Sequence, residues 1–211
     1  MKITSFSLLK LMARYEDNYF DLAIVDPPYG INFADKGGDG SGRLTKHRWK
    51  QHKRKKWDRE TPNSKYFEEL FRVSKNQIIW GGNYMTDNIP PSMGWVFWDK
   101  GQRNFSLADG ELAFTSFNRA LRVFTMTRPE ALQEGERLHP TQKPIKLYEW
   151  LLQNYAKEGD KILDTHLGSG SIAIACHNMK YDLTACELDK EYYDKAMKRI
   201  EQHKQQLTLF K

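Results

Sequence analysis

Four consecutive residues near the N-terminus combine a carboxylate with an aromatic ring on a stiff loop. Asp26, Pro27, Pro28 and Tyr29 follow the apolar run 22–25, which has the composition of a buried strand. Because two prolines cannot continue a strand, we expect the chain to turn sharply at its carboxyl end. Asp can accept hydrogen bonds from an amino group, and Tyr can stack on a flat base. The pattern predicts a site for a base carrying an amino group, although Asp and Pro also favour ordinary turns.

A second candidate site lies near the C-terminus. A strand pattern over 161–164 is followed by a turn with two glycines and then by a helix of small residues. The glycines let the backbone approach a ligand closely, and the free N–H groups of the helix's first turn face that ligand. Glu187 lies 23 residues beyond Asp164, near the spacing at which an acid binds ribose hydroxyls in Rossmann-like sites.

This second site predicts a nucleoside cofactor without phosphates. The turn lacks the complete Gly-x-Gly-x-x-Gly pattern for a pyrophosphate, and the chain has no Gly-Lys-Ser/Thr sequence for a triphosphate. S-adenosylmethionine fits these features best, and a tight structural turn with a surface Glu is the alternative. The residues predicted to bind the cofactor here are Asp164, Thr165, His166, Leu167, Gly168, Ser169, Gly170, Ser171 and Glu187.

The positive charge of the chain is concentrated in one segment. The whole chain has a net charge of +6, but residues 43–59 hold nine Lys or Arg against one Asp, which leaves −2 for the rest. Basic residues interleaved with Trp and His suit phosphate binding and base stacking, so we expect a flexible basic loop over 35–60 that binds DNA. A solvated loop or a localisation signal is the alternative. The predicted DNA-binding residues are Arg43, Lys46, Arg48, Lys50, Lys53, Arg54, Lys55, Lys56 and Arg59.

Composition predicts one folded domain spanning residues 1–211. Hydrophobic residues make up 39% of the chain and aromatic residues 13% of the chain, which excludes a disordered chain. No apolar stretch approaches the roughly 20 residues that span a bilayer, and no signal peptide is recognisable, so a cytoplasmic protein without membrane contact is expected. Cys176 and Cys186 lie in apolar segments, which indicates reduced, buried packing residues.

Strand and helix patterns alternate along the chain. This alternation predicts a mainly parallel, twisted α/β sheet with helices on both faces and ligands at the carboxyl ends of the strands. The expected strands are 22–26, 76–80, 95–98, 111–115, 121–125, 161–164 and 182–186. The expected helices are 6–15, 64–74 with an N-cap at Ser64, 145–156, 171–179 and 189–206.

The chain resembles the amino-group DNA methyltransferases, in the permuted arrangement where the catalytic motif precedes the S-adenosylmethionine motif. Three motifs in this order carry the resemblance: residues 26–29, the His-Pro-Thr-Gln-Lys-Pro stretch 139–144, and residues 164–171 with Glu187. It implies a Rossmann-like methyltransferase fold with circularly permuted motif order. The middle motif closes over the cofactor in this family, which implies cofactor contacts from His139, Thr141 and Lys143. The Lys143 ammonium could pair with the methionine carboxylate.

The resemblance implies site-specific methylation of the exocyclic N6 of a flipped adenine, with DNA as partner and no metal. Asp26 and the carbonyl of Pro27 would accept hydrogen bonds from the amino group, Pro28 would stiffen the loop, and Tyr29 would stack on the base. In the family, Asp at the first motif position usually accompanies adenine, and Ser accompanies cytosine. Family members often form dimers, so a homodimer is one expectation. A restriction–modification system, a phage and an orphan regulator all remain open as settings.

Three other functions remain open. N4-cytosine methylation uses the same motifs. Methylation of RNA or of a protein glutamine uses a similar loop that commonly begins with Asn, whereas this chain has Asp26. A non-catalytic nucleic-acid-binding protein is the third alternative, and it rests on His166, which stands where the family usually has Phe.

Overall fold

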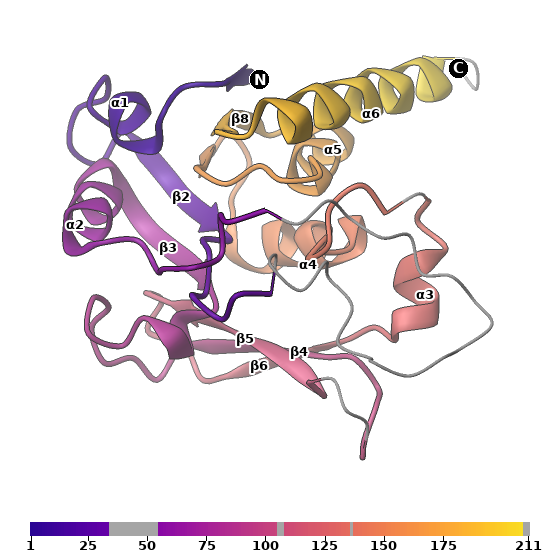
Figure 1. The fold of residues 1–211 in the computed structure, drawn as a ribbon. Coiled ribbons are helices and arrows are strands. Elements are labelled where there is room, and N and C mark those ends of the chain that lie inside the picture. Colours follow the sequence, from indigo (N-terminus) through magenta and orange to yellow (C-terminus); the bar gives the residue numbers. More distant parts are fainter. Residues whose placement is uncertain (34–54, 105–107, 136, 209–211) are drawn as a thin grey trace.

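The chain forms one eight-stranded sheet with the strand order β1-β8-β7-β2-β3-β5-β4-β6. The computed structural model describes residues 1–33, 55–104, 108–135 and 137–208 (Figure 1). The strands are β1 (Lys2–Thr4), β2 (Phe20–Val25), β3 (Ser74–Trp80), β4 (Trp95–Asp99), β5 (Gly110–Thr115), β6 (Arg122–Thr125), β7 (Lys161–Asp164) and β8 (Asp182–Cys186).

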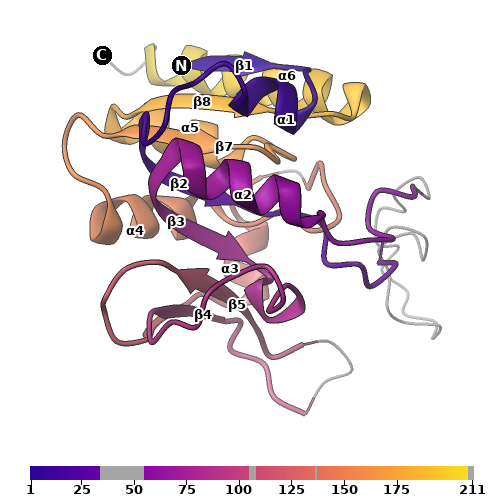
Figure 2. The same ribbon diagram turned by 90° about the vertical axis from the view of Figure 1, so that its left-hand side faces the viewer.

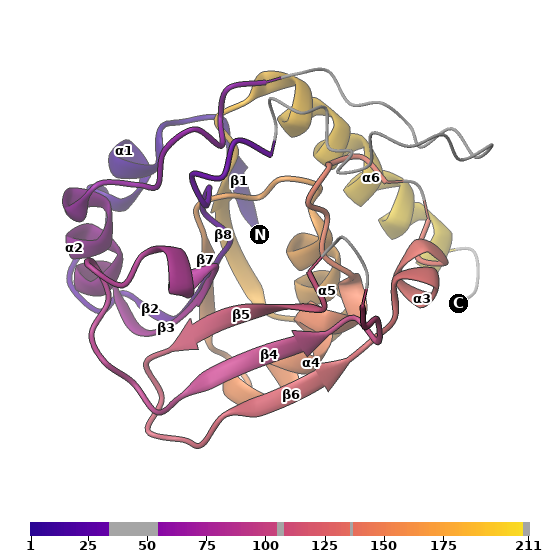
Figure 3. The ribbon, with the colours of Figure 1, turned by 60° about the horizontal axis from the view of Figure 1, so that its bottom comes forward.

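Seven of the eight strands run in one direction, and β5 alone is reversed. It pairs antiparallel with β3 on one side and β4 on the other, whereas the other pairs are parallel. Figure 3 shows β5 between the two. Loops that follow the other strands therefore meet at a single edge of the sheet. The amino end of β5 reaches that edge too, and it brings Glu111 with it.

Helices cover both faces of the sheet, as Figures 1 and 2 show. Two pack on one face, α1 (Leu8–Met12) and α2 (Ser64–Val73), and three pack on the other, α4 (Ile145–Tyr155), α5 (Ser171–Met179) and α6 (Lys190–Thr208). The short helix α3 (Arg128–Leu132) follows β6, and a 3-10 turn, η2 (Gly82–Tyr84), follows β3.

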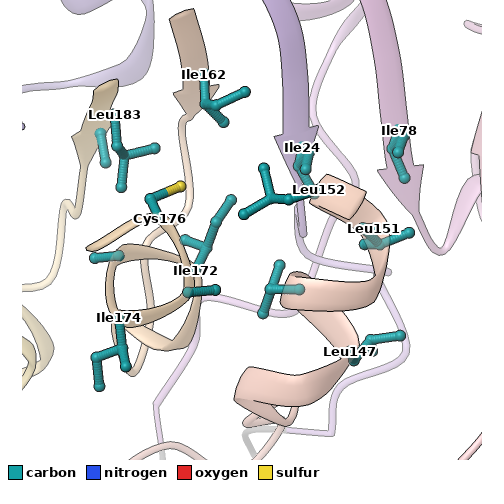
Figure 4. Packing of buried hydrophobic residues seen from close by; sticks show 14 of the residues in the cluster. Ile24, Ile78, Leu147, Leu151, Leu152, Ile162, Ile172, Ile174, Cys176 and Leu183 are labelled. Atoms are coloured by element: carbon teal, nitrogen blue, oxygen red, sulfur yellow. The ribbon is translucent and has the colours of Figure 1, made fainter. Parts of the chain in front are cut away.

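The central strand β2 is apolar on both sides because it is covered on both sides. Leu22 and Ile24 face the core beneath α4 and α5, whereas Ala23 and Val25 face the core beneath α1 and α2. Figure 4 shows Ile24 close to side chains of α4 and α5. Burial on both faces holds β2 rigidly, so the loop after Val25 starts from a fixed point.

The structure confirms the predicted α/β class and the predicted strands and helices, with shifts of a few residues at their ends. Sequence reasoning missed β1 and α3, which are three and five residues long. The N-cap of α2 is Asn63, whose side chain accepts a hydrogen bond from Tyr66 N, and the prediction of Ser64 was wrong by one residue.

Both cysteines are buried and free, as predicted. None of the helices in the described part of the chain has the length and apolar composition that crossing a membrane requires. The described residues also contain no group of three or more His, Cys, Asp or Glu side chains placed to hold a metal ion.

Candidate active site

The three motifs meet at one edge of the sheet. Asp26 follows β2, Asp164 is the last residue of β7, and Glu187 follows β8. Strand β2 lies between β7 and β3, so these loops are neighbours in space although the sequence separates them widely. Open α/β sheets bind ligands at such a point, beyond the carboxyl ends of strands whose connections run in opposite directions.

A cavity of about 960 Å³ opens at this edge. Two of the predicted residues, Asp164 and Gly170, are buried and do not line it. The predicted residues that line it are Asp26, Pro27, Pro28, Tyr29, His139, Thr141, Lys143, Thr165, His166, Leu167, Gly168, Ser169, Ser171 and Glu187.

Asp26 belongs to a buried network of alternating charges. Its Oδ2 lies 2.6 Å from the Nζ of Lys143, and its Oδ1 accepts a hydrogen bond of 2.8 Å from the Tyr29 hydroxyl. Lys143 also lies 3.1 Å from a carboxylate oxygen of Glu111, whose other oxygen lies 2.5 Å from the Nζ of Lys100. The network thus holds two carboxylates and two ammonium groups, so each charge has a partner of opposite sign.

Burial and charge act in opposite directions on these pKa values. Burial raises the pKa of Asp26 above its ordinary value, and Lys143 offsets only part of that increase. For Glu111, burial is outweighed by Lys143 and Lys100, which lower its pKa to about 2. The pKa of Lys143 is raised because its two carboxylate partners outweigh its burial. Glu111 and Lys143 are therefore charged near neutral pH, and Asp26 is the member whose charge is easiest to lose.

The ring of Tyr29 is fixed by its neighbours. A Cβ at Gly81 would lie within 2.2–2.7 Å of that ring, and Gly81 has φ +67, so glycine is required there. On the open side, Tyr84 stacks on Tyr29 with ring centroids 5.2 Å apart and planes 15° apart. Tyr84 is 48% exposed and lines the cavity. Sequence reasoning did not identify it as a site residue.

Asp58 anchors the loop that follows Asp26. Its Oδ1 accepts hydrogen bonds from the backbone N of Tyr29 (2.8 Å) and Gly30 (3.1 Å), and its Oδ2 accepts one from the N of Phe33 (2.8 Å). The residue is only 3% exposed. In sequence, Asp58 appears as the lone acid of a basic segment, and nothing there indicates that it holds another loop.

Replacing Asp58 by Ala is expected to lower both stability and turnover. Three backbone N–H groups would lose their acceptor, which costs about 3 kcal/mol of unfolding free energy, and the loop carrying Asp26 would lose its fixed position. Thermal unfolding and kcat for methyl transfer would measure the two effects. Asp58→Asn keeps one carbonyl acceptor and should give intermediate stability and turnover, whereas Glu68→Ala, at an exposed position of α2 outside the cavity lining, should change neither. An Asp58→Ala protein with unchanged kcat would contradict the anchoring role.

Glu187 and the glycine turn form the opposite end of the cavity. Glu187 accepts hydrogen bonds from the backbone N of Gly168 (2.8 Å) and of Asp189 (2.9 Å). Gly168 and Gly170 both adopt positive φ, +54 and +78. Asp164 accepts a hydrogen bond from His166 N, and burial raises its pKa well above the ordinary value.

His166 contributes a neutral ring at the turn. Burial lowers its pKa to about 3, so the imidazole is uncharged at neutral pH. The ring packs edge-on against Tyr66, with centroids 5.5 Å apart, and its Nδ1 lies 2.9 Å from the Thr165 hydroxyl. The position where the family usually has Phe thus holds a flat, neutral, partly buried ring that lines the cavity.

The side chains of the His139–Pro144 motif contact different parts of the cavity. The ring of His139 contacts Trp57 and Tyr192, with centroid distances of 5.0 and 4.3 Å, and its Nδ1 lies 3.0 Å from the Thr141 hydroxyl. Lys143 instead reaches the Asp26 network. The prediction that Lys143 pairs with the cofactor's carboxylate stays a prediction, and the structure shows its ammonium paired with Asp26 and Glu111.

Most of the predicted basic loop falls outside the described residues. Those positions are Arg43, Lys46, Arg48, Lys50, Lys53 and Arg54. Among the three that are described, Lys55 pairs with Asp189 (2.7 Å) and Glu191 (3.2 Å), and it lies 4.0 Å above the Tyr192 ring. Lys56 and Arg59 are exposed. Lys55 therefore ties the end of the segment to the start of α6.

Comparison with known proteins gives a consistent result. A family model described as DNA methylase matches residues 113–198. The type II methyltransferase M.HpaI of Haemophilus parainfluenzae is 23% identical over 92% of this chain and 72% of its own. The M1.HpyAVI–SAM complex (TM-score 0.60, 18% identity, 94% and 98% of the chains) and the cytosine-N4-specific PvuII DNA methyltransferase (TM-score 0.58, 11% identity, 95% and 90%) have the same fold.

The mainly parallel sheet, with a glycine turn after β7 and an acid after β8, has the Rossmann-like fold of its methyltransferase structural neighbours. The family match over residues 113–198 and the curated relatives make the chain similar to DNA methylases in sequence as well as in fold.

Proposed function

We propose that this enzyme methylates the exocyclic N6 of adenine in DNA at a specific site. The observation that carries the proposal is the partly buried Asp26 carboxylate, which opens the Asp-Pro-Pro-Tyr loop in the same cavity as the glycine turn. In the family, Asp at this position usually accompanies adenine. The base must leave the duplex to reach a cavity of this kind, because its amino group is inaccessible within the stack.

Asp26 and the Pro27 carbonyl align the amino group. S-adenosylmethionine supplies an electrophilic methyl group on a sulfonium sulfur. Each carboxylate oxygen of Asp26 carries a second lone pair beyond those used by Tyr29 and Lys143. Hydrogen bonds from the amino group to Asp26 and Pro27 would direct the nitrogen lone pair and stabilise the positive charge that develops on nitrogen. Asp26 acts as an acceptor, and the nitrogen loses its proton after transfer.

The aromatic pair of Tyr29 and Tyr84 would provide the stacking surface for the base. Tyr29 is held by Gly81 and by its hydroxyl bond to Asp26, and burial raises its pKa, so the hydroxyl stays protonated as a donor. Tyr84 extends the surface toward solvent with its exposed ring. The basic segment 43–59 would bind the surrounding DNA backbone.

Glu187 would hold the ribose of the cofactor, and Glu187→Gln is expected to weaken S-adenosylmethionine binding about tenfold. The amide keeps one acceptor oxygen, and the two backbone N–H groups already in place compete for it. Isothermal titration of the cofactor would measure the change. Glu201→Gln, on the exposed face of α6, is the matched control. Equal affinities for the two variants would refute the assignment of Glu187 to the ribose.

The decisive test of the proposed function is methyl transfer from labelled S-adenosylmethionine to mixed-sequence DNA, followed by nucleoside analysis. N6-methyladenine is the expected product. If the product is N4-methylcytosine, the acceptor base is cytosine and not adenine, and the enzyme is still an amino-group DNA methyltransferase. No methylated nucleoside from a protein that binds the cofactor would reject DNA as the substrate, and RNA and protein acceptors would then be tested.

A further inference from the structure

Two arginines line the cavity, and neither forms an ion pair with a carboxylate of the described residues. Arg128 is the first residue of α3, and Arg137 follows it in the loop to the His139–Pro144 motif. Both are partly buried and both line the cavity. Burial lowers the pKa of each guanidinium, and Arg128 also repels Arg137. A pair of like charges held in this way is costly unless an anion binds between them.

Glu111 is the carboxylate that interacts electrostatically with both arginines, and it already pairs with two lysines. Its two oxygens lie 2.5 Å from Lys100 and 3.1 Å from Lys143, and the latter also neutralises Asp26. The two lysines and the two carboxylates thus balance one another. The arginines add two positive charges that this network leaves uncompensated.

Between Arg128 and Arg137, both acids in the described part of the chain, Glu130 and Glu134, also have other hydrogen-bond partners, and Glu136 lies outside the described residues. Glu130 accepts hydrogen bonds from the backbone N and the hydroxyl of Thr127, at 2.7 and 2.8 Å. Glu134 accepts them from the backbone N of Ile145 and Lys146, at 2.5 and 3.0 Å. Within the described residues, the Arg128 side chain forms no hydrogen bond or ion pair. Arg137 donates to the carbonyls of His139 and Pro140.

We propose that Arg128, supported by Arg137, binds a backbone phosphate that flanks the flipped acceptor nucleotide. This inference rests on the proposed function, because it needs a base at Asp26. Arg128 follows the carboxyl end of β6 and lines the same cavity as Asp26, so a base at Asp26 would bring its own sugar-phosphate toward this wall. A guanidinium presents several donors in a fixed fork that matches phosphate oxygens.

The charge distribution separates this anion from the cofactor. The cofactor end of the cavity carries the Glu187 carboxylate, proposed to bind the ribose hydroxyls, and Asp189, which pairs with Lys55. The methionine carboxylate is the one other anion that the bound substrates supply. An effect on DNA alone would indicate the phosphate, whereas an effect on S-adenosylmethionine would indicate the carboxylate.

The test uses the full-length enzyme, the Arg128→Gln variant and DNA whose methylated position has been mapped. Loss of one phosphate contact should weaken DNA binding roughly 10- to 100-fold and reduce the slope of log K against log salt by about 0.9. Cofactor affinity should not change. A duplex with one neutral methylphosphonate linkage beside the mapped base should weaken binding by the wild type but not by Arg128→Gln.

Two further variants keep the test independent of folding defects. Arg128→Lys retains the charge and should restore the salt slope. Arg122→Gln removes a charge at the amino end of β6, the end opposite to the site, and should leave the slope unchanged. A normal slope in Arg128→Gln, or weaker cofactor binding with normal DNA binding, would overturn the proposal. If the wild-type enzyme methylated no DNA, the proposed function would be rejected before the role of Arg128 was tested.

Discussion

Replacing Asp26 by Ala is expected to reduce kcat on the order of 10³-fold, because removal of one preorganised transition-state partner typically has that effect. The variant loses the acceptor that aligns the amino group, but the glycine turn and Glu187 stay in place at the other end of the cavity. S-adenosylmethionine affinity should therefore change little. Single-turnover methylation and isothermal titration of the cofactor would measure the two quantities separately.

The folded state should survive this substitution because Lys143 keeps a counter-ion. Its Nζ remains beside Glu111, at 3.1 Å. Asp26→Asn retains one acceptor oxygen and should lose less activity than Asp26→Ala. The matched control is Asp21→Ala, which removes a carboxylate at the opposite end of the same strand, where Asp21 pairs with Lys75. Full activity in Asp26→Ala would eliminate the proposed acceptor role.

The fold was predictable because its elements have local sequence patterns. Strand β2 is an apolar run that two prolines terminate, and β7 ends at a glycine turn. Such patterns locate both ends of the cavity, since parallel strands place their carboxyl ends at one edge. The reversed direction of β5 has no such local pattern. It depends on pairing with β3 and β4 over long sequence separations.

The same limit explains which site residues were missed. Glu111 reaches the site because β5 is reversed, and it meets Tyr29 across 82 positions of sequence. Asp58 contacts the backbone of Tyr29 from 29 positions away. Lys143 was found through its motif, but its ion pairs with Asp26 and Glu111 were not predicted, because a motif identifies a residue and not the direction of its side chain. The distance of 2.6 Å between the Nζ of Lys143 and the Oδ2 of Asp26 identifies this ion pair, and the sequence does not.

Replacing Lys143 by Met is expected to shift the acid limb of the pH–rate profile to higher pH. Burial already raises the pKa of Asp26, and Lys143 is the main group that opposes this increase. Without the ammonium, the pKa rises further, and protonation removes the acceptor charge at a higher pH. As pH falls, the variant therefore loses activity at a higher pH than the wild type does. Because an uncompensated carboxylate stays buried, unfolding free energy should also fall by about 3 kcal/mol.

The variants Lys143→Arg and Lys100→Met separate charge from packing. Lys143→Arg keeps a cation and should restore the wild-type limb. Lys100→Met removes a cation that contacts Glu111 but not Asp26, so it should move the limb much less than Lys143→Met. If Lys143 instead bound the methionine carboxylate, Lys143→Met would weaken S-adenosylmethionine binding and leave the acid limb unchanged. The pH profile and the cofactor titration together therefore decide which anion Lys143 serves.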